Sequence, residues 1–237
     1  MTTTSQSEKS PVYGYLQKPT MVDFPGHLAS IMFTSGCNFR CGFCHNAPLM
    51  AESKGGLPWE KLENACRKFK ADWVSGIVIS GGEPTLWDEQ LLELIAFFRK
   101  FDFDIKLDTN GSRPRVLEKA LPRVDFVSMD VKCSLEQYKS LAGFADTDKI
   151  KESIEMIKKG PVKHEFRTTV IESKHSDAEM LAIGKLIKGA DSYILQPFVP
   201  RDNLPDEALR NEPRTSPDRL QELREMLDHC ANSVTAK

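Results

Sequence analysis

The chain has 237 residues and a formal net charge of −2, and 40% of its residues are hydrophobic. This length suits one large domain or two small ones with a sizeable core. The charge pattern contains no basic block, which argues against nucleic acid as a direct partner, and no stretch approaches the roughly 20 apolar residues of a membrane span. Because the six cysteines come without a signal peptide, we expect a cytoplasmic protein in a reducing environment.

The amino-terminal stretch is polar and rich in Ser and Thr, and we expect residues 1–12 to be a disordered tail. One domain is expected over residues 13–237. Within it, Pro25-Gly26 provides turn chemistry and predicts a hairpin that leads into an apolar run, residues 28–33. An apolar run of that length is typical of a buried strand.

The most distinctive stretch follows this strand directly and reads Cys37-Asn38-Phe39-Arg40-Cys41-Gly42-Phe43-Cys44-His45. A loop at the carboxyl end of a strand is where parallel sheets place their chemistry. Three thiolates close together in one loop, residues 37–45, can hold three irons of a cubane cluster. No fourth cysteine is nearby, and Cys66 falls on the apolar side of a predicted helix, so one iron is left free to bind another molecule.

Four alternative roles for these cysteines account for less of the pattern. Three incidental buried cysteines would not need such crowding. A structural zinc site usually has four ligands in two separated pairs, and His45 could add only one. A redox dithiol leaves Cys37 unexplained, and covalent haem at the C-x-x-C-H of residues 41–45 normally forms outside the cytoplasm. The sequence therefore favours an iron–sulfur cluster.

Beyond the loop, the chain alternates helix and strand. Apolar periodicity predicts helices near 59–69, 91–98, 114–120, 148–159, 176–187 and 216–227, and strands at 76–80, 104–108, 126–132, 164–171 and 193–198. Six strands with intervening helices imply parallel pairing with right-handed crossovers. Six units are too few for a closed eight-stranded barrel, so we predict an α/β fold with a partial (β/α)6 barrel. Residues 200–215 show no apolar period and are expected to form a surface loop before the last helix, within a carboxyl-terminal region of residues 200–230.

Polar residues collect where the predicted strands end. Gly81-Gly82-Glu83-Pro84 follows the second strand, and its glycines would let the backbone approach a ligand closely. Asp108-Thr109-Asn110 and Asp130-Val131-Lys132 end the next two strands. A lysine at such a position suits an anionic carboxylate as a point charge.

An arginine and two histidines complete the polar residues of the second half. Arg167 lies on the fifth strand, where a buried arginine needs a partner. It is expected either to face a cofactor or to pair with Glu165 or another acid. His164 and His175 are expected at the surface or in loops.

The C-x3-C-x2-C motif, with an aromatic residue before its last cysteine, resembles the signature of the radical S-adenosylmethionine enzymes. The resemblance implies a [4Fe–4S] cluster held by Cys37, Cys41 and Cys44, with S-adenosylmethionine bound to the free iron. It also implies reductive cleavage of this cofactor to methionine and a 5′-deoxyadenosyl radical, which abstracts a hydrogen atom. The (β/α)6 fold and the Gly-Gly-Glu-Pro segment are similar to those of the same enzymes.

Several segments resemble, more narrowly, the enzymes that activate glycyl-radical partners. These segments are Asp23-Phe24-Pro25-Gly26, Cys44-His45-Asn46, Asp108-Thr109-Asn110-Gly111 and Asp130-Val131-Lys132. Phe43 replaces the usual tyrosine, which keeps an aromatic face for adenine and removes the hydroxyl. Residues 16–46 are similar to the anaerobic ribonucleoside-triphosphate reductase activating proteins. Residues 197–199, Pro-Phe-Val, lack the histidine of the pyruvate formate-lyase activating enzymes, which argues against that type.

The resemblance also implies roles for individual residues. The cluster cysteines and Lys132 would carry catalysis, and a monovalent cation would bind near Asp108, Thr109 and Asp130. The residues implied in binding S-adenosylmethionine are Phe43, His45, Gly81, Gly82, Glu83, Asp108, Asn110, Asp130, Lys132 and Arg167. The implied partners are a glycyl-radical enzyme, anaerobic ribonucleotide reductase in the first place, and an electron donor of the flavodoxin or ferredoxin type.

Two other functions fit parts of the sequence. The same radical chemistry could act on a small molecule, as in a deazaguanine-forming ring contraction, or on a different peptide or glycyl-radical enzyme. A non-enzymatic electron-transfer or metal-binding protein would leave the motifs at the later strand ends without a purpose. We therefore expect a radical S-adenosylmethionine activating enzyme, whose partner the sequence does not identify.

Overall fold

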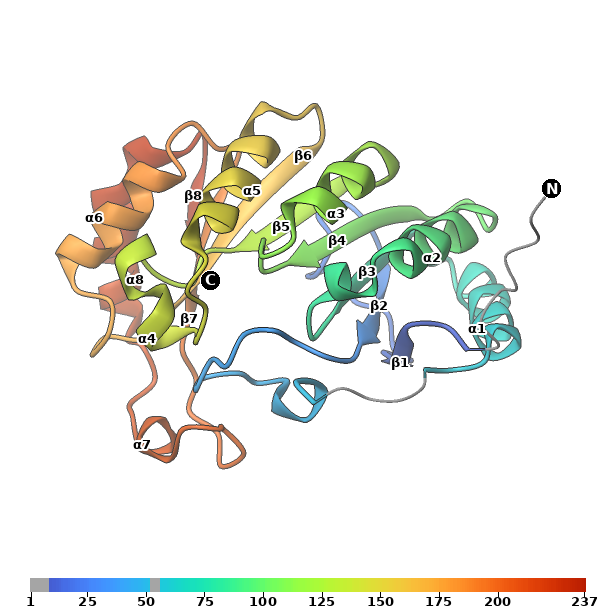
Figure 1. Cartoon of the computed structure of the whole chain (residues 1–237), viewed down its shortest axis with the longest axis horizontal. Helices are drawn as coiled ribbons and strands as arrows, with labels where there is room; N and C mark the ends of the chain where they lie inside the picture. Colours follow the sequence, from blue (N-terminus) through green and yellow to red (C-terminus); the bar gives the residue numbers. More distant parts are fainter. Residues whose placement is uncertain (1–8, 52–55) are drawn as a thin grey trace.

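The computed structural model describes residues 9–51 and 56–237 of the chain. Within them, eight strands form one sheet, and their order in space is their order along the chain (Figure 1). The strands are β1 (Val12–Tyr15), β2 (Ala29–Thr34), β3 (Gly76–Gly81), β4 (Asp104–Thr109), β5 (Phe126–Asp130), β6 (Lys163–Val170), β7 (Tyr193–Pro197) and β8 (Val234–Ala236). β1 is antiparallel to β2, and every later pair of neighbours is parallel.

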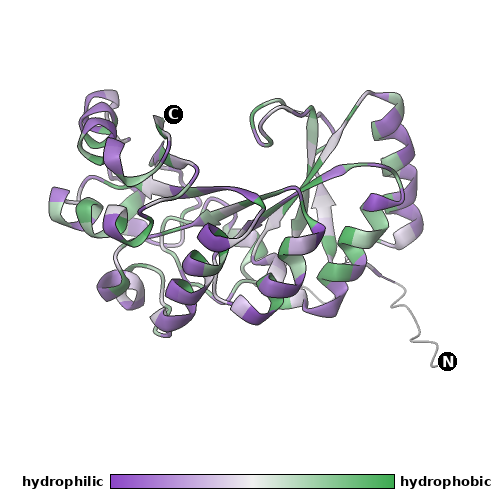
Figure 2. Ribbon diagram, turned by 90° about the horizontal axis from the view of Figure 1, so that it is seen from above, coloured by the Kyte–Doolittle hydropathy of each residue, from purple (hydrophilic) through white to green (hydrophobic). Residues whose placement is uncertain are grey.

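Helices connect the parallel strands and turn their apolar stripes toward the sheet. They are α1 (Trp59–Ala71), α2 (Glu89–Arg99), α3 (Pro114–Ala120), α4 (Tyr138–Leu141), α5 (Thr147–Lys159), α6 (Asp177–Leu186), α7 (Glu207–Arg210) and α8 (Pro217–Leu227). Figure 2 shows the hydrophilic colour mainly on the helix sides turned away from the strands. In α1, for example, Leu62, Cys66 and Phe69 are buried, which confirms Cys66 as a core residue. Among the described residues, no helix is long and apolar enough to cross a membrane.

The six strands expected from the sequence are β2 to β7, and their parallel pairing confirms the partial (β/α)6 barrel. β1 and β8 stand at opposite ends of the strand order, so the sheet does not close. Parallel strands direct all their carboxyl ends to one edge of the sheet. The loops that follow β2 to β7 therefore meet at that edge.

The hairpin between β1 and β2 closes the opposite end of the barrel. Phe24 is buried, and its ring centroid lies 6.0 Å from that of Phe126, the first residue of β5. The carbonyl oxygen of Asp23 accepts a hydrogen bond from Lys106 Nζ at 2.6 Å. The Asp-Phe-Pro-Gly segment thus forms a floor beneath the parallel strands, at the end of the predicted hairpin.

Two terminal features differ from the expectation. Val12 is fully buried at the start of β1, and the N–H of Ser10 donates to the carbonyl of Leu57 at 2.9 Å. The described part of the expected 1–12 tail is therefore packed, whereas residues 1–8 lie outside the described residues. The sequence does not predict β8, because three residues show no period and only pairing with β7 makes them a strand.

Candidate active site

A cavity of about 430 Å³ opens at the carboxyl ends of the parallel strands. Its walls are the cluster loop, residues 37–45, the strand β2 and the ends of β3 to β7, and Asp23 of the floor also lines it. Of the site residues expected from the sequence, it is lined by Cys37, Cys41, Phe43, Cys44, His45, Gly81, Gly82, Asp108, Thr109, Asn110, Asp130, Lys132 and Arg167. Glu83 alone among them does not line it. The fold therefore brings together residues that the sequence spreads over several βα units.

The cluster loop is fastened by hydrogen bonds of its own backbone and of its neighbours. The N–H of Cys44 donates to the carbonyl of Cys41 at 3.2 Å, and the N–H of Arg40 donates to the carbonyl of Ala142 at 2.7 Å. The guanidinium of Arg40 donates a hydrogen bond to the carbonyl of Cys37 at 2.6 Å. Contacts within the protein thus define the shape of the loop that presents the three thiols.

The segment that follows β7 fastens the cluster loop from outside. His45 Nε2 donates to the carbonyl of Val199 at 2.9 Å, and the N–H of Asp206 donates to the carbonyl of Gly42 at 3.1 Å. A Cβ on Gly42 would lie 2.7 Å from Cβ of Asp206, so only glycine fits there. The expected surface loop, residues 200–215, therefore packs against the cluster loop at Gly42. The binding of a cofactor by His45 stays a prediction, and its Nε2 is already engaged.

The three thiols fit an iron–sulfur cluster better than a single metal ion. Burial raises the pKa of Cys37, Cys41 and Cys44, to about 12 for Cys41, and the Lys132 ammonium acts in the opposite direction on each. Thiolates are soft ligands that suit iron–sulfur clusters, in which each cysteine binds a different iron. In the described part of the chain, no three His, Cys, Asp or Glu side chains are grouped so that they could hold one metal ion.

Gly81 and Gly82 lie where a side chain would not fit. Gly81 has a φ of +117°, and a Cβ on Gly82 would lie 2.1 Å from the carbonyl oxygen of Gly36. The N–H of Gly82 donates to the carbonyl of Thr34 at 2.9 Å, and the N–H of Glu83 donates to that of Gly36 at 2.8 Å. The N–H groups of Gly82 and Glu83 are therefore already hydrogen-bonded within the protein. The backbone groups that this turn offers to a ligand are its carbonyl oxygens.

Glu83 connects two strand ends, and its contact with the cofactor stays a prediction. Its side chain is fully buried, and its carboxylate accepts from the Thr109 hydroxyl at 2.8 Å and from the Asn110 N–H at 2.6 Å. The N–H of Thr85 donates to it at 3.0 Å. Burial raises the pKa of Glu83, and these hydrogen bonds act against that rise. Glu83 thus ties the end of β3 to the end of β4.

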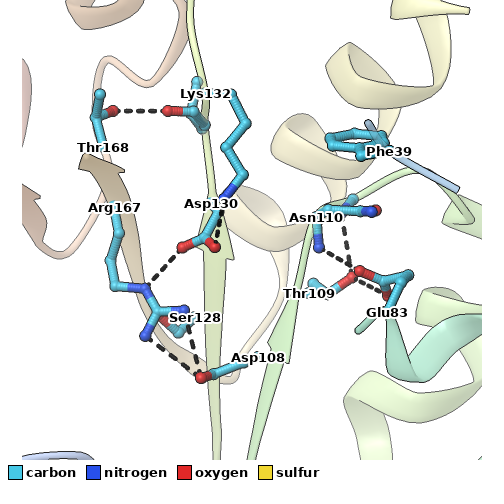
Figure 3. A network of polar contacts seen from close by, with 12 residues as sticks. Phe39, Glu83, Asp108, Thr109, Asn110, Ser128, Asp130, Lys132, Arg167 and Thr168 are labelled. Atoms are coloured by element: carbon cyan, nitrogen blue, oxygen red, sulfur yellow. Dashed lines mark hydrogen bonds and ion pairs between the residues drawn. The ribbon is translucent and has the colours of Figure 1, made fainter. Parts of the chain in front are cut away.

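Charged side chains from β4, β5, the loop after β5 and β6 form one network in the cavity (Figure 3). Arg167 Nε donates to Asp130 Oδ1 at 2.8 Å, and its Nη2 lies 3.3 Å from Asp108 Oδ2. Lys132 Nζ donates to Asp130 Oδ2 at 2.8 Å. Arg167 therefore lines the cavity and also pairs with acids, although its partners are Asp108 and Asp130 rather than Glu165.

The network holds its members in their charged forms. Burial would raise the pKa of Asp130, but Arg167 and Lys132 outweigh it and hold that pKa well below its usual range. Burial would lower the pKa of Lys132, but Asp130 and Cys41 raise it above its usual value. Lys132 Nζ also lies 5.8 Å from the ring centroid of Phe43. A cation beside an aromatic face suits a ligand that carries both a carboxylate and a flat ring.

The residues expected around a monovalent cation are arranged differently. Side chains alternate along β4, so Thr109 points away from Asp108, and its hydroxyl donates to Glu83. Arg167 bridges the carboxylates of Asp108 and Asp130. Asp108 Oδ1 is buried, and within the described residues it has no hydrogen-bond donor. A cation at this place stays a prediction.

Sequence reasoning missed a second buried ion pair below this network. Lys106 Nζ lies 3.0 Å from Glu165 Oε1, and the Ser128 hydroxyl donates to the same oxygen at 2.8 Å. Lys106 precedes Asp108 by two residues on β4. Side chains two residues apart on a strand point to the same face. This spacing was the signal that Lys106 and Asp108 both face the barrel interior.

His175 lies in a loop, as expected, but it is fully buried. Its Nε2 donates to the carbonyl of Lys132 at 3.0 Å, and its Nδ1 accepts from the N–H of Ile171 at 2.9 Å. The N–H of Lys132 donates to the hydroxyl of buried Tyr138 at 3.2 Å. Two buried side chains to which the sequence assigned no role in the site thus hold the backbone of Lys132. His164 is also buried, on β6, so the expectation for it was wrong.

A second cavity of about 600 Å³ lies on the other side of the cluster loop. Arg40, Gly42 and Cys133 line it, and Phe43 separates it from the first. None of the three motif cysteines lines this larger cavity. We place the active site in the smaller cavity, because it collects the thiols and the charged network.

Comparison with known proteins shows what this chain is similar to. Residues 31–187 match the Radical SAM superfamily. The chain is 33% identical over 236 residues to a "putative glycyl-radical enzyme activating enzyme" of Methanocaldococcus jannaschii, with 97% of this chain and 96% of that protein covered. It is 29% identical over 189 residues to the pyruvate formate-lyase-activating enzyme of Clostridium pasteurianum, with 75% and 78% covered. The structure of Streptococcus suis SuiB bound to precursor peptide SuiA has a similar fold, with a TM-score of 0.68 at 16% identity over 87% of this chain and 48% of that one.

Proposed function

The chain belongs to the radical S-adenosylmethionine superfamily, and we propose that it is the activating enzyme of a glycyl-radical enzyme. Membership implies a [4Fe–4S] cluster and S-adenosylmethionine as cofactors. The observation that carries the proposal is the single cavity in which three thiols of one short loop meet Lys132, Asp130 and Arg167. The relative that the chain matches along nearly its whole length is itself named for this class.

Different residues of the cavity suit different parts of the two cofactors. Cys37, Cys41 and Cys44 would hold the cluster. The Lys132 ammonium suits the methionine carboxylate, the carbonyl oxygens of the Gly81–Gly82 turn suit the methionine ammonium, and Phe43 offers a face to adenine. When bound, the cluster supplies the electron that cleaves S-adenosylmethionine into methionine and a 5′-deoxyadenosyl radical.

The proposed target is the Cα hydrogen of a backbone glycine in a partner enzyme. A glycine has no side chain, so a loop that carries it can enter a cavity that would exclude bulkier residues. The proposed products are a glycyl radical on the partner and 5′-deoxyadenosine. The resemblance of residues 16–46 supports anaerobic ribonucleoside-triphosphate reductase as the partner, and a flavodoxin- or ferredoxin-type protein as the electron donor follows from the same resemblance.

The test starts with anaerobic reconstitution of the protein with iron and sulfide, followed by reduction and addition of S-adenosylmethionine. We expect 5′-deoxyadenosine and methionine in equal amounts, and a glycyl-radical EPR signal once the partner reductase is added. Cys37→Ala, Cys41→Ala and Cys44→Ala should each abolish all three signals. Cys66→Ala is the matched control, because Cys66 is buried in α1 outside the loop, and it should keep them.

Cleavage retained by a Cys37→Ala protein would refute the assignment of the cluster. Cleavage by the wild type without a glycyl radical on the reductase would refute this partner and leave two alternatives. These are another glycyl-radical enzyme and a small-molecule substrate of the deazaguanine-synthase kind. Trials with other glycyl-radical enzymes and with candidate small molecules would decide between them.

A further inference from the structure

A group of hydrogen-bonded side chains joins the end of β4 to the cluster loop, and the proposed chemistry does not use it. Asn110 Nδ2 donates to Asn38 Oδ1 at 3.1 Å and lies 3.9 Å from Cys37 Sγ. Figure 3 shows Asn110 between Glu83 and Phe39, a residue of the cluster loop. The sequence predicts Asn110 as a ligand of S-adenosylmethionine, yet its amide is turned toward the cluster loop.

The orientation of the Asn110 amide is determined by its partners. The backbone N–H of Ser112 donates to Asn110 Oδ1 at 2.9 Å. A backbone N–H can only donate, so the amide oxygen must face Ser112 and the NH₂ group must face Asn38 and Cys37. Asn38 is held in turn, because its own Nδ2 donates to the Ser112 hydroxyl at 2.9 Å.

The backbone of Asn110 is held as firmly as its side chain. Its N–H donates to Glu83 Oε2 at 2.6 Å, and both residues are buried. At the other end of the residue, Ser112 fixes the amide oxygen. An amide that is held at both ends keeps its donor directed at one sulfur atom.

Cys37 differs from the other two cysteines of the cluster loop because a side-chain hydrogen-bond donor, the Asn110 amide, lies near its sulfur. Cys37 Sγ accepts from the N–H of Phe39 at 3.4 Å in addition to the Asn110 amide. In the described part of the chain, the structure records no side-chain hydrogen bond to the sulfur of Cys41 or Cys44. Hydrogen bonds to the sulfurs are one of the factors that set the reduction potential of a cluster.

We propose that Asn110 is a positioning residue of the cluster, whose amide raises the reduction potential through Cys37 Sγ. The inference rests on the cluster of the proposed function. Reduction adds one electron from the donor protein, and an N–H dipole directed at a cluster sulfur stabilises the added negative charge. No bond forms or breaks at Asn110. Its removal makes the cluster harder to reduce but leaves all three cysteine ligands in place.

The experiment is a redox titration of the reconstituted protein. The EPR signal of the reduced cluster measures the reduced fraction at each potential. Asn110→Ser removes the amide and stays neutral, and Asn110→Asp keeps an acceptor for Ser112 while replacing the donor by a negative charge. We expect the ratio of reduced to oxidised cluster at a fixed potential to fall about tenfold in Asn110→Ser, which is about 59 mV for a one-electron couple. The fall should be larger in Asn110→Asp.

Asn46→Ser is the matched control. Asn46 lines the same cavity, and no hydrogen bond from its side chain to a cluster sulfur is recorded among the described residues. Its potential should equal that of the wild type. Iron and sulfide content is measured in every variant, because a merely structural role would change cluster content and not the potential.

Equal potentials in the wild type and an Asn110 variant, at equal iron and sulfide content, would overturn the inference. An equal shift in Asn46→Ser would overturn it as well, because any amide at the cavity would then act alike. If Asn110→Asp takes up no cluster, the neutral Asn110→Ser decides the question. A wild-type protein that takes up no cluster would count against the proposed function itself.

Discussion

His175 Nε2 lies 3.0 Å from the carbonyl oxygen of Lys132. A carbonyl can only accept, so Nε2 carries the proton and Nδ1 is free to accept the N–H of Ile171 at 2.9 Å. The Nδ1 contact needs the neutral imidazole, because a protonated Nδ1 could only donate, to the Ile171 carbonyl oxygen 3.2 Å away. A fully buried histidine thus connects the loop after β6 to the residue whose ammonium lines the active site.

We expect His175→Ala to destabilise the protein strongly. The substitution leaves the Lys132 carbonyl and the Ile171 N–H without a partner, and each unsatisfied buried group costs about 1–3 kcal/mol. The free energy of unfolding, measured in urea, should fall by roughly 2–4 kcal/mol. His229→Ala is the control, because His229 is exposed, and it should change stability by less than about 0.5 kcal/mol. Equal losses in both variants would contradict the role of His175.

The same histidine should make stability depend on pH. Burial lowers the pKa of His175, and the carbonyl oxygens of Lys132 and Ile171, the latter 3.2 Å from Nδ1, and the charge of Glu179 offset this only in part. The folded pKa therefore lies below the unfolded value of about 6.5, so the unfolded chain binds the proton more readily. The contribution of His175 to stability is complete above the unfolded pKa. It is lost as the pH falls through the folded pKa.

This pH dependence can be measured with a variant that does not titrate. Between pH 7 and pH 5, the free energy of unfolding should fall more in the wild type than in His175→Gln. The remaining fall in the variant reports the other titrating groups of the chain. Parallel curves for the two proteins would show that His175 does not titrate on unfolding.

The turn of Gly81 and Gly82 should tolerate no side chain. A Cβ on Gly82 would lie 2.1 Å from the carbonyl oxygen of Gly36, which joins β2 to the cluster loop. Gly82→Ala should therefore displace the turn and weaken binding of S-adenosylmethionine at least about tenfold, or 1.4 kcal/mol. Equilibrium dialysis of the reconstituted protein measures the affinity. Gly14→Ala is the control, because nothing lies within 4 Å of a Cβ at Gly14, and its affinity should not change.

Because Gly42 and Asp206 are in contact, we expect a substitution at Asp206 to rescue the effect of a substitution at Gly42. Gly42→Ala brings two Cβ atoms to 2.7 Å, so it should lower both the iron content after reconstitution and the free energy of unfolding, the latter by about 1–3 kcal/mol. Adding Asp206→Gly removes the opposing Cβ and should restore most of both. Iron analysis and urea unfolding of the two single variants and the double variant measure the coupling. Purely additive losses would mean that the segment after β7 does not support the cluster loop.

The strands and the cysteine loop could be predicted, because their signals are local. The six expected strands match β2 to β7 within two residues at each end. β2, β3 and β7 appear as short apolar runs, and β4 and β6 show an alternation of apolar and polar residues. The loop of residues 37–45 was found through the crowding of three thiols, which needs no knowledge of distant contacts. The burial of Glu83 away from the cavity lining was not predicted, because its motif says nothing of whether its side chain faces the cavity or the core.

The sequence by itself determined the α/β class, the order of the strands and the chemistry of the cluster loop, because apolar runs and cysteine spacing lie within short stretches of chain. Only the tertiary structure decided the partners: Arg167 with Asp108 and Asp130, Asn110 with Cys37, and His175 with Lys132. The physical reason is that the register between strands and the alternation along each strand decide which side chains meet. Those contacts join residues from different βα units, and no local pattern encodes them.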